Sequence, residues 1–207
     1  MCQFFMIHPM TPQPRLIHRT AEILQRAGVI VYPTDTAYAL GCRMGEAEAV
    51  NRIRRIRNLS ERHNFTLACR DLSDIGTYAK VENNAFRLLK AHTPGPYTFI
   101  LPATSEVPRR LQHPRRKTIG IRVPDCAIAS AIFAEIGEPL MSTTLLLPGD
   151  DLPLTDPELM RERVGAHVDL VIDGGAGGLE LSTVIDLTGE MPSVIRRGAG
   201  DAAVFEA

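Results

Sequence analysis

Apolar and polar positions recur with two different periods along this chain, and each period predicts a type of element. From residue 15 to 27, apolar side chains fall every three or four positions, as in an amphipathic helix that ends at Gly28. Residues 29–32 are continuously apolar, as in a buried strand. Further helices are predicted over 46–57, 71–78, 82–90, 127–136 and 157–164, and strands over 65–69, 97–101, 118–123, 140–144, 168–172, 182–187 and 193–196.

Strands and helices alternate over most of the chain, but the last strands have no helix between them. Alternation is typical of an α/β fold, whereas strands joined by short turns pair antiparallel. The glycine-rich segment 173–178 lies between two predicted strands and is interpreted as a flexible hairpin, not as a dinucleotide-binding loop. We predict one α/β domain over residues 1–207, with a twisted, mixed parallel and antiparallel sheet flanked by helices.

The composition narrows the function classes without choosing one. Lys+Arg number 23 and Asp+Glu 24, a formal net charge of -1, so an anion site requires local clustering of cations. The four widely spaced cysteines are predicted to be reduced thiols, and the histidines lack metal-ligand spacing, so no protein metal site is predicted. No apolar run has the length of a membrane helix or a signal peptide, which predicts a cytoplasmic protein with no membrane partner.

Basic residues cluster in two short stretches that contain no acidic residue. Residues 52–57 hold four arginines, and residues 109–117 hold four arginines and one lysine. On a helix, Arg54 and Arg57 share one face while Arg52 and Arg55 share another, so one pair faces solvent and the other reaches a cleft. The two basic stretches are either solvated surfaces or parts of an anion site. Two uncompensated runs in a neutral chain favour an anion site for phosphate or an RNA backbone.

Hydroxyl side chains follow several of the predicted strands. Thr34 and Thr36 follow the strand at 29–32, while Ser142 to Thr144 and Ser182 to Thr183 lie in later strands. Ligands of open α/β sheets bind beyond the strand ends. Taken singly, each hydroxyl belongs to a turn that satisfies its own backbone; taken together, they supply neutral donors for a small polar ligand. The chain has no GxxxxGK[ST], HExxH or GxSxG motif.

Six sequence blocks in a fixed order carry a family resemblance. They are Tyr32–Gly41, Pro94–Thr98, Gly120–Pro124, Pro139–Thr144, Ser182–Leu187 and Ile195–Gly198. In this order the blocks resemble the YrdC family of threonylcarbamoyl-AMP synthases, most closely its YciO branch, over about residues 15–200. The resemblance implies a YrdC-like fold with a large basic cavity, without the additional C-terminal domain of the larger members.

The resemblance also implies a reaction. L-threonine, bicarbonate and ATP give threonylcarbamoyl-AMP and pyrophosphate, in the pathway to N6-threonylcarbamoyladenosine in tRNA. ATP is then a substrate, Mg²⁺ is expected with it, and the protein is expected to be a monomer or a homodimer. The enzyme need supply little covalent chemistry, because holding the reactants in line and neutralising the pyrophosphate charge carry most of the catalysis.

Particular residues match the family's functional positions. Arg55 and Arg57 match the catalytic positions that hold the triphosphate. The nucleotide side would comprise Thr118, Ser142, Thr144 and Arg196. The threonine pocket would comprise Thr34, Thr36, Arg122 and Ser182.

Two positions depart from the family's motifs. Arg57-Asn58-Leu59 stands where the synthases have Lys-x-Arg, and Thr144-Leu145-Leu146 where they have Ser-x-Asn. Each lost hydrogen bond to a charged group costs about 1.5–3 kcal/mol, so two additive losses lower activity by about 10²–10⁴-fold. Synthase activity is then weak, or Arg54 and Arg55 substitute, or the ligand differs.

Two other functions remain open from the sequence. One is a non-catalytic YciO-type module that binds double-stranded RNA, tRNA or rRNA through its phosphates, with a second basic stretch in the run after residue 108. The residues of that stretch are Arg109, Arg110, Arg115, Arg116 and Lys117. The other is a small-molecule-binding domain for a different nucleotide or amino acid.

Overall fold

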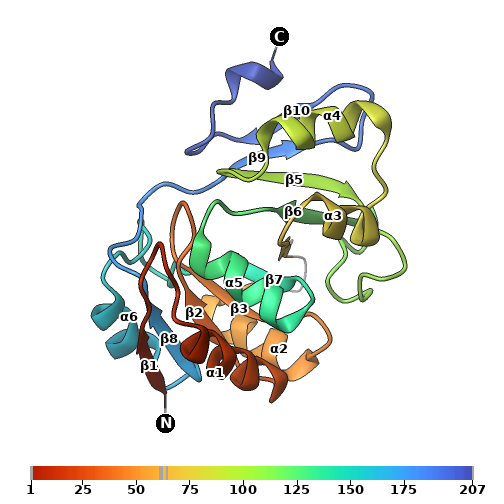
Figure 1. The fold of residues 1–207 in the computed structure, drawn as a ribbon. Coiled ribbons are helices and arrows are strands. Elements are labelled where there is room, and N and C mark those ends of the chain that lie inside the picture. Colours follow the sequence, from red (N-terminus) through yellow and green to blue (C-terminus); the bar gives the residue numbers. More distant parts are fainter. Residues whose placement is uncertain (1, 61–62, 64, 207) are drawn as a thin grey trace.

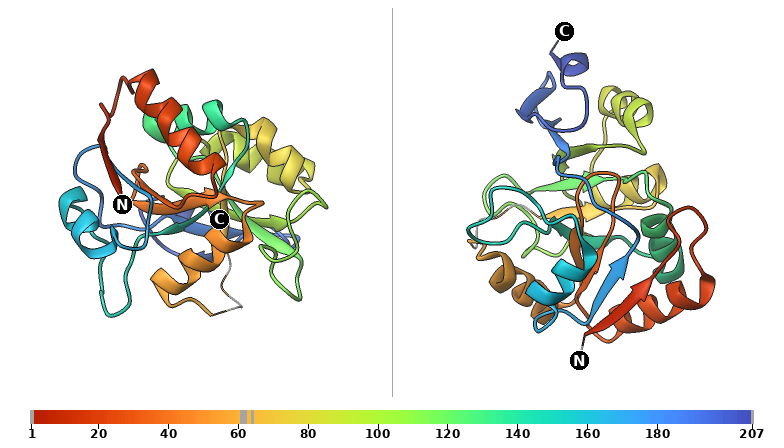
Figure 2. Two further views of the ribbon diagram at one scale, coloured as in Figure 1. Left: turned by 90° about the horizontal axis from the view of Figure 1, so that it is seen from below. Right: turned by 90° about the vertical axis from the view of Figure 1, so that its left-hand side faces the viewer.

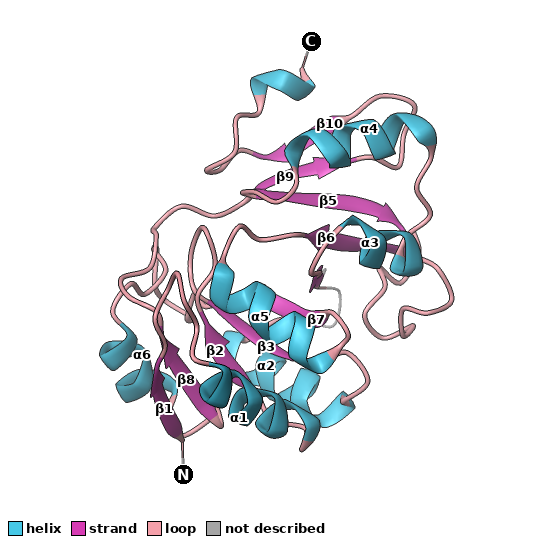
Figure 3. Cartoon of the chain, viewed as in Figure 1, coloured by secondary structure: helices cyan, strands magenta, loops and turns pink. Residues whose placement is uncertain are grey.

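The computed structural model describes residues 2–60, 63 and 65–206, and these form one mixed sheet flanked by helices (Figures 1 and 3). The strands are β1 Gln3–Met6, β2 Ile30–Tyr32, β3 Ala39–Arg43, β4 Thr66–Ala68, β5 Tyr97–Pro102, β6 Thr118–Arg122, β7 Leu140–Thr144, β8 Leu170–Asp173, β9 Thr183–Asp186 and β10 Ser193–Arg196. The helices are α1 Pro14–Gln25, α2 Ala47–Arg57, α3 Leu72–Tyr78, α4 Asn83–His92, α5 Ala127–Ile136, α6 Pro157–Val164 and the 3₁₀ turn η1 Ala203–Phe205.

The strand order across the sheet is β1-β8-β2-β3-β7-β4-β6-β5-β9-β10. Strand β8 runs parallel to both β1 and β2, β4 parallel to β6, and β5 parallel to β9. The remaining neighbours are antiparallel. The predicted single α/β domain with a mixed sheet is therefore confirmed.

Two strands and one connection differ from the sequence prediction. The sequence pattern predicts no strand at β1 or β3, although β3 pairs with β2 and β7 near the middle of the sheet. The predicted hairpin at residues 173–178 is wrong, because β8 and β9 belong to different halves of the sheet. The segment instead crosses between the halves in close contact with Thr36, where a Cβ on Gly178 would lie 2.4 Å from the Thr36 carbonyl oxygen.

Helices cover the two faces of the β1-to-β7 half of the sheet differently. Helices α1 and α5 pack against each other on one face, while α2 packs on β3 and α6 on β8 from the opposite side (Figure 2). Alternate strand residues point to these two layers: Ile30 and Tyr32 belong to the cluster under α1 and α5, and Val31 to the cluster under α2. Helices α3 and α4 lie beside β5 and β6 in the other half (Figure 1). None of the helices in the described part of the chain has the length and apolarity to span a bilayer.

Candidate anion-binding cavity

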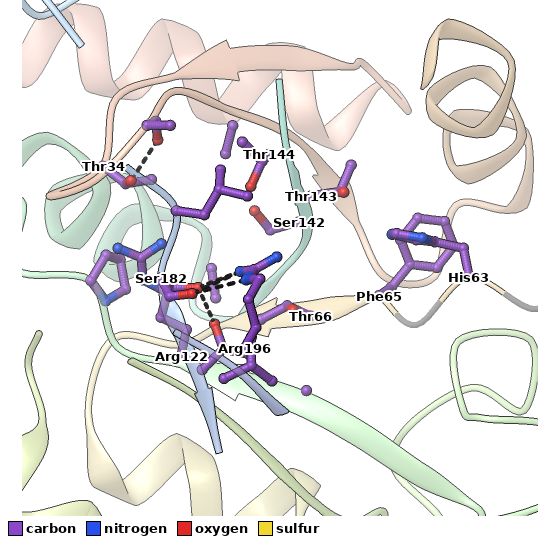
Figure 4. A pocket seen from close by; sticks show the side chains of 18 of the residues that line it. Thr34, His63, Phe65, Thr66, Arg122, Ser142, Thr143, Thr144, Ser182 and Arg196 are labelled. Carbon is purple, nitrogen blue, oxygen red and sulfur yellow. Dashed lines mark hydrogen bonds between the residues drawn. The ribbon is translucent and has the colours of Figure 1, made fainter. Parts of the chain in front are cut away.

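A cavity of about 260 Å³ lies on the same face of the sheet as α1 and α5, and residues of neither helix line it. On β7, Leu140 belongs to the cluster under those helices, and Ser142, two residues later on the same face, lines the cavity. Figure 4 shows hydroxyl and guanidinium groups pointing into this space from several strands. The hydroxyl residues of the lining are Tyr32, Thr34, Thr66, Thr98, Thr118, Ser142, Thr143, Thr144 and Ser182.

Small residues at alternate strand positions create the space. On β6, Thr118 and Gly120 line the cavity, while Ile121 belongs to the hydrophobic cluster on the other face. A Cβ on Gly120 would lie 2.9 Å from Thr66 Oγ1 and 3.3 Å from the methyl group of Thr98. The glycine therefore permits three strands to approach at the floor of the cavity.

Three arginines from different elements converge on this cavity: Arg57 at the end of α2, Arg122 at the end of β6, and Arg196 at the end of β10. Arg122 forms an ion pair with Asp35, and both side chains are 12% exposed. Arg196 donates to the carbonyl oxygen of Ser182 from Nη2 at 2.8 Å and from Nε at 3.2 Å. Backbone oxygens hold its guanidinium in place without neutralising it.

The charge of the cavity favours an anionic ligand. Within the described residues, neither Arg57 nor Arg196 forms an ion pair with a carboxylate, and Arg57 Nε is buried without a hydrogen-bond partner. Desolvation lowers the pKa of Arg57, and desolvation followed by repulsion from Arg122 lowers that of Arg196. Crowded guanidiniums without counterions are costly, and an anion would relieve that cost. The arrangement is suited to phosphate or carboxylate.

Buried hydroxyls hold several of the cavity hydroxyls in position. Tyr32 Oη lies 2.7 Å from Ser142 Oγ, and Thr98 Oγ1 lies 2.8 Å from Ser182 Oγ on the β5–β9 side. Thr34 Oγ1 donates to the Ala37 carbonyl oxygen at 2.6 Å, which fixes the turn after β2. Neutral groups fixed in this way interact with a ligand without having to reorganise.

Most of the sequence-predicted site residues meet in this cavity. They are Thr34, Arg57, Thr118, Arg122, Ser142, Thr144, Ser182 and Arg196. Thr36 is 6% exposed and lies behind Thr34, with 3.2 Å between the two hydroxyl oxygens, and does not line the cavity. A threonine-pocket role for Thr36 would therefore act through Thr34.

Arg55 is placed differently from the prediction. The two arginine faces of α2 diverge as predicted, but Arg55 lies on the face away from the cavity and lines a groove with Arg163 and His167. Its side chain is 72% exposed, and its nearest carboxylate oxygen, on Glu48, is 3.9 Å away. Arg55 does not line the cavity with Arg57, because residues two apart on a helix point about 200° apart, and triphosphate contact by Arg55 stays a prediction.

The basic run between β5 and β6 lies outside the cavity. Arg110 donates to the carbonyl oxygens of Met44 and Gly45, and Arg116 pairs with Asp186 at 2.6 Å. Arg115 is exposed, and Arg109 and Lys117 line a shallow groove of their own. Two of the five cations, Arg110 and Arg116, therefore have partners within the protein. RNA contact by this basic stretch stays a prediction.

The two departures from the synthase motifs also have distinct places. Leu146 lines the cavity and presents an apolar side chain there. Leu59 packs on the large hydrophobic cluster next to α2 and is absent from the lining. Within the described residues, the arginines of the lining are Arg57, Arg122 and Arg196. Neither Arg54 nor Arg55 therefore supplies to the cavity the positive charge of the motif arginine, whose position is occupied by Leu59. Arg54 instead lies over the Phe65 ring and donates to the Ser60 carbonyl oxygen.

Sequence reasoning did not select many residues of the lining as site residues. The polar or small ones among them include Tyr32, His63, Thr66, Thr98 and Gly120. Thr66, Thr98 and Gly120 each place a small or hydroxyl side chain within an otherwise apolar strand. Such interruptions on one face of a strand are the sequence signal for these lining residues. His63 carried no such signal. Burial, followed by repulsion from Arg57 and Arg54, lowers its pKa.

Comparisons with known proteins identify the family and the fold. The family model for Sua5, YciO and YrdC proteins, described as "Telomere recombination", matches residues 22–198. YciO of Escherichia coli is 55% identical over 205 residues, 99% of this chain and 100% of YciO, and its crystal structure has a TM-score of 0.96. A threonylcarbamoyl-AMP synthase of Halorhodospira halophila is 32% identical over 178 residues, covering 86% of this chain and 92% of the synthase.

A solved structure with a ligand is also similar. P. abyssi Sua5 complexed with L-threonine is 25% identical, with a TM-score of 0.90, and the match covers 98% of this chain but 59% of that protein. The family model spans most of the present chain, and the YciO match extends over nearly all of it. The resemblance drawn from the six sequence blocks is thereby confirmed, and this chain belongs to the Sua5/YciO/YrdC family.

Proposed function

We propose that this protein binds ATP and L-threonine in the cavity and converts them, with bicarbonate, to threonylcarbamoyl-AMP and pyrophosphate. The observation that carries the proposal is the convergence of Arg57, Arg122 and Arg196 on one hydroxyl-lined space. The names of the synthase relative and of the threonine complex support the substrate class.

The proposed reaction has two bond-forming steps. The amine nitrogen of threonine bonds to the carbon of bicarbonate, and water leaves to give a carbamate. A carbamate oxygen then attacks the α-phosphorus of ATP. The bond from that phosphorus to the bridging oxygen breaks, and its electron pair leaves with pyrophosphate. The cavity residues must align these groups and stabilise the charge that develops on pyrophosphate.

The lining offers a group for each charged part of the reactants. Arg57 and Arg196, whose guanidiniums have no carboxylate partner in the described chain, would bind phosphate oxygens. Thr118, Ser142 and Thr144 would donate neutral hydrogen bonds on the nucleotide side. Arg122 would bind the threonine carboxylate, with Thr34 and Ser182 around the side chain.

A magnesium ion fits this cavity only together with the nucleotide. No carboxylate of the described residues lines the cavity, and no cluster of three or more His, Cys, Asp or Glu side chains occurs among them. Phosphate oxygens, water and the hydroxyls of Thr118, Ser142 and Thr144 would therefore hold Mg²⁺. When bound, the ion would neutralise phosphate charge.

The reaction is expected to be slow relative to that of the synthases. Leu146 places a side chain without hydrogen-bonding capacity in the lining, where the synthase motif has asparagine. Losing one hydrogen bond to a charged group corresponds to about a tenfold to hundredfold loss of rate.

Product formation from isotopically labelled bicarbonate, L-threonine and ATP tests the proposal directly. Labelled threonylcarbamoyl-AMP, identified by mass, is expected from the wild-type protein, and at least tenfold less from Arg57→Ala. Arg55→Ala is the matched control on the same helix and should retain wild-type rates, because Arg55 lies outside the cavity. A wild-type rate no higher than that of Arg57→Ala would reject the proposal.

A further inference from the structure

We infer that Tyr32 is a positioning residue, whose phenol hydrogen directs the Ser142 hydroxyl so that Ser142 donates to an anionic oxygen of the ligand. The inference rests on the proposed function, because it requires a phosphate-bearing ligand in the cavity. It concerns a residue that does not act on the ligand through its own hydroxyl and that sequence reasoning did not select.

The two hydroxyls form a close pair at the edge of the cavity. Tyr32 Oη and Ser142 Oγ are 2.7 Å apart, with the tyrosine 0% exposed on β2 and the serine 7% exposed on β7. The strand between them is β3, where Gly41 pairs with Ser142. A Cβ on Gly41 would lie 2.8 Å from the Tyr32 ring, so the glycine lets the phenol reach across β3.

Satisfying both buried hydroxyls determines the direction of the hydrogen bond. Within the described residues, Ser142 Oγ is the sole hydrogen-bond partner of Tyr32 Oη. Tyr32 belongs to the lining but is 0% exposed, so if Ser142 donated to Tyr32, the phenol hydrogen would be buried without an acceptor, at the cost of its desolvation. If Tyr32 donates, both groups are satisfied once a ligand or water in the cavity accepts from Ser142. The second arrangement is therefore the stable one.

Packing holds the tyrosine ring in the required place. The Phe133 ring of α5 meets it edge to face, with 6.2 Å between centroids and 82° between planes. Burial raises the pKa of Tyr32, so the phenol keeps its hydrogen throughout the neutral pH range. A fixed donor behind Ser142 leaves the serine with one favoured orientation, towards the cavity, and this lowers the reorganisation needed to bind an anion.

A double-mutant cycle with inorganic pyrophosphate as the probe tests the inference. The dissociation constant is measured by calorimetry for wild type, Tyr32→Phe, Ser142→Ala and the double variant. Tyr32→Phe keeps the ring and its packing on Phe133 and removes only the hydroxyl. The expected result is a rise of about tenfold in the dissociation constant for each single variant, and no further rise when Tyr32→Phe is added to Ser142→Ala.

Tyr38→Phe is the matched control. Tyr38 is 1% exposed, but its hydroxyl donates to the Gly175 carbonyl oxygen at 2.7 Å and contacts no cavity hydroxyl. Its loss should lower thermal stability and leave the pyrophosphate affinity within about twofold of wild type. The inference requires that Tyr32→Phe weaken pyrophosphate binding more than Tyr38→Phe does.

Each other outcome has a defined meaning. Wild-type affinity in Tyr32→Phe overturns the inference and leaves the proposed function intact. An equal loss from Tyr32→Phe in the presence and absence of Ser142 overturns it as well, because Tyr32 then acts independently of the serine. Absence of pyrophosphate binding by the wild-type protein rejects the proposed function, and the inference with it.

Discussion

The two halves of one sheet face differ in what covers them and in what their side chains do. Under α1 and α5, sheet residues such as Ile30, Leu170 and Ile172 are large, apolar and buried in a packed cluster. Beyond the helices, positions on the same face carry Ser142, Thr66 and other small or hydroxyl side chains, and a cavity forms. The backbone hydrogen bonding continues across both regions.

This comparison shows how one sheet serves stability and binding together. The packed half stabilises the fold by removing apolar surface from water. The open half leaves space lined by groups that interact with a ligand, and it contributes less to stability because few of its side chains pack closely. The candidate site therefore lies where the side chains on this face become small. Substitutions on the two sides should separate stability from ligand affinity.

The largest expected effect is on the packed half. Phe133 is 2% exposed and contacts Tyr32, so Phe133→Ala should lower the free energy of unfolding by about 3–5 kcal/mol, measured by urea denaturation. Phe86→Ala is the control, since Phe86 is 47% exposed on α4 and should cost about 1 kcal/mol or less. Equal losses from the two variants would show that this half is not tightly packed.

The second effect is on the open half. Arg196→Ala should weaken pyrophosphate binding by about ten- to a hundredfold in calorimetry, with little change in the unfolding midpoint, because among the described residues its guanidinium hydrogen-bonds to Ser182 alone. The adjacent Arg197→Ala is the control: Arg197 is 67% exposed and pairs with Glu206, away from the lining. A loss of affinity in Arg197→Ala as large as in Arg196→Ala would point to general surface charge instead of a site.

The third effect is a gain. Leu146→Asn restores a hydrogen-bonding side chain to the lining and should raise the rate of threonylcarbamoyl-AMP formation by about tenfold. Leu147→Asn provides the comparison, because Leu147 is 7% exposed and belongs to the large hydrophobic cluster. That variant should lose stability without gaining activity. A rate unchanged by Leu146→Asn would show that Leu146 does not limit the reaction.

The smallest effect concerns pH. Burial, followed by repulsion from Arg57 and Arg54, lowers the pKa of His63 below 6.5, so the folded state disfavours its protonation. As pH falls below 6.5 the unfolded state takes up the proton first, and the free energy of unfolding should decrease slightly.

His63→Gln removes the titrating group and should abolish this part of the pH dependence in urea denaturation between pH 7.5 and 5. Pyrophosphate affinity should change in the opposite direction, because a protonated His63 adds positive charge to the lining. If wild type and His63→Gln show the same pH profile, His63 does not carry the effect.

Local patterns in the sequence determined most of the elements. The helices α1, α2 and α5 lie within two residues of their predicted bounds, because their apolar spacing and end signals are local properties. Strand β3 was not predicted because it contains Gly41, a weak strand former. The glycine is required there by side chains of the neighbouring strands, chiefly the Tyr32 ring. The hairpin predicted at 173–178 was wrong for a similar reason. Glycines indicate a turn, but they do not indicate whether the two flanking strands pair with each other.

The candidate site shows the same division. Residue type and block order selected Arg57, Arg122 and Arg196 from the sequence, because guanidiniums and the family motifs are visible there. Only the tertiary structure decided that Arg55 points away, that Thr36 lies behind Thr34, and that Tyr32 holds Ser142. The Tyr32–Ser142 contact joins residues 110 apart in the chain. The positions of Arg55 and Thr36 depend on how α2 and the turn after β2 lie relative to the cavity, which a local pattern does not contain.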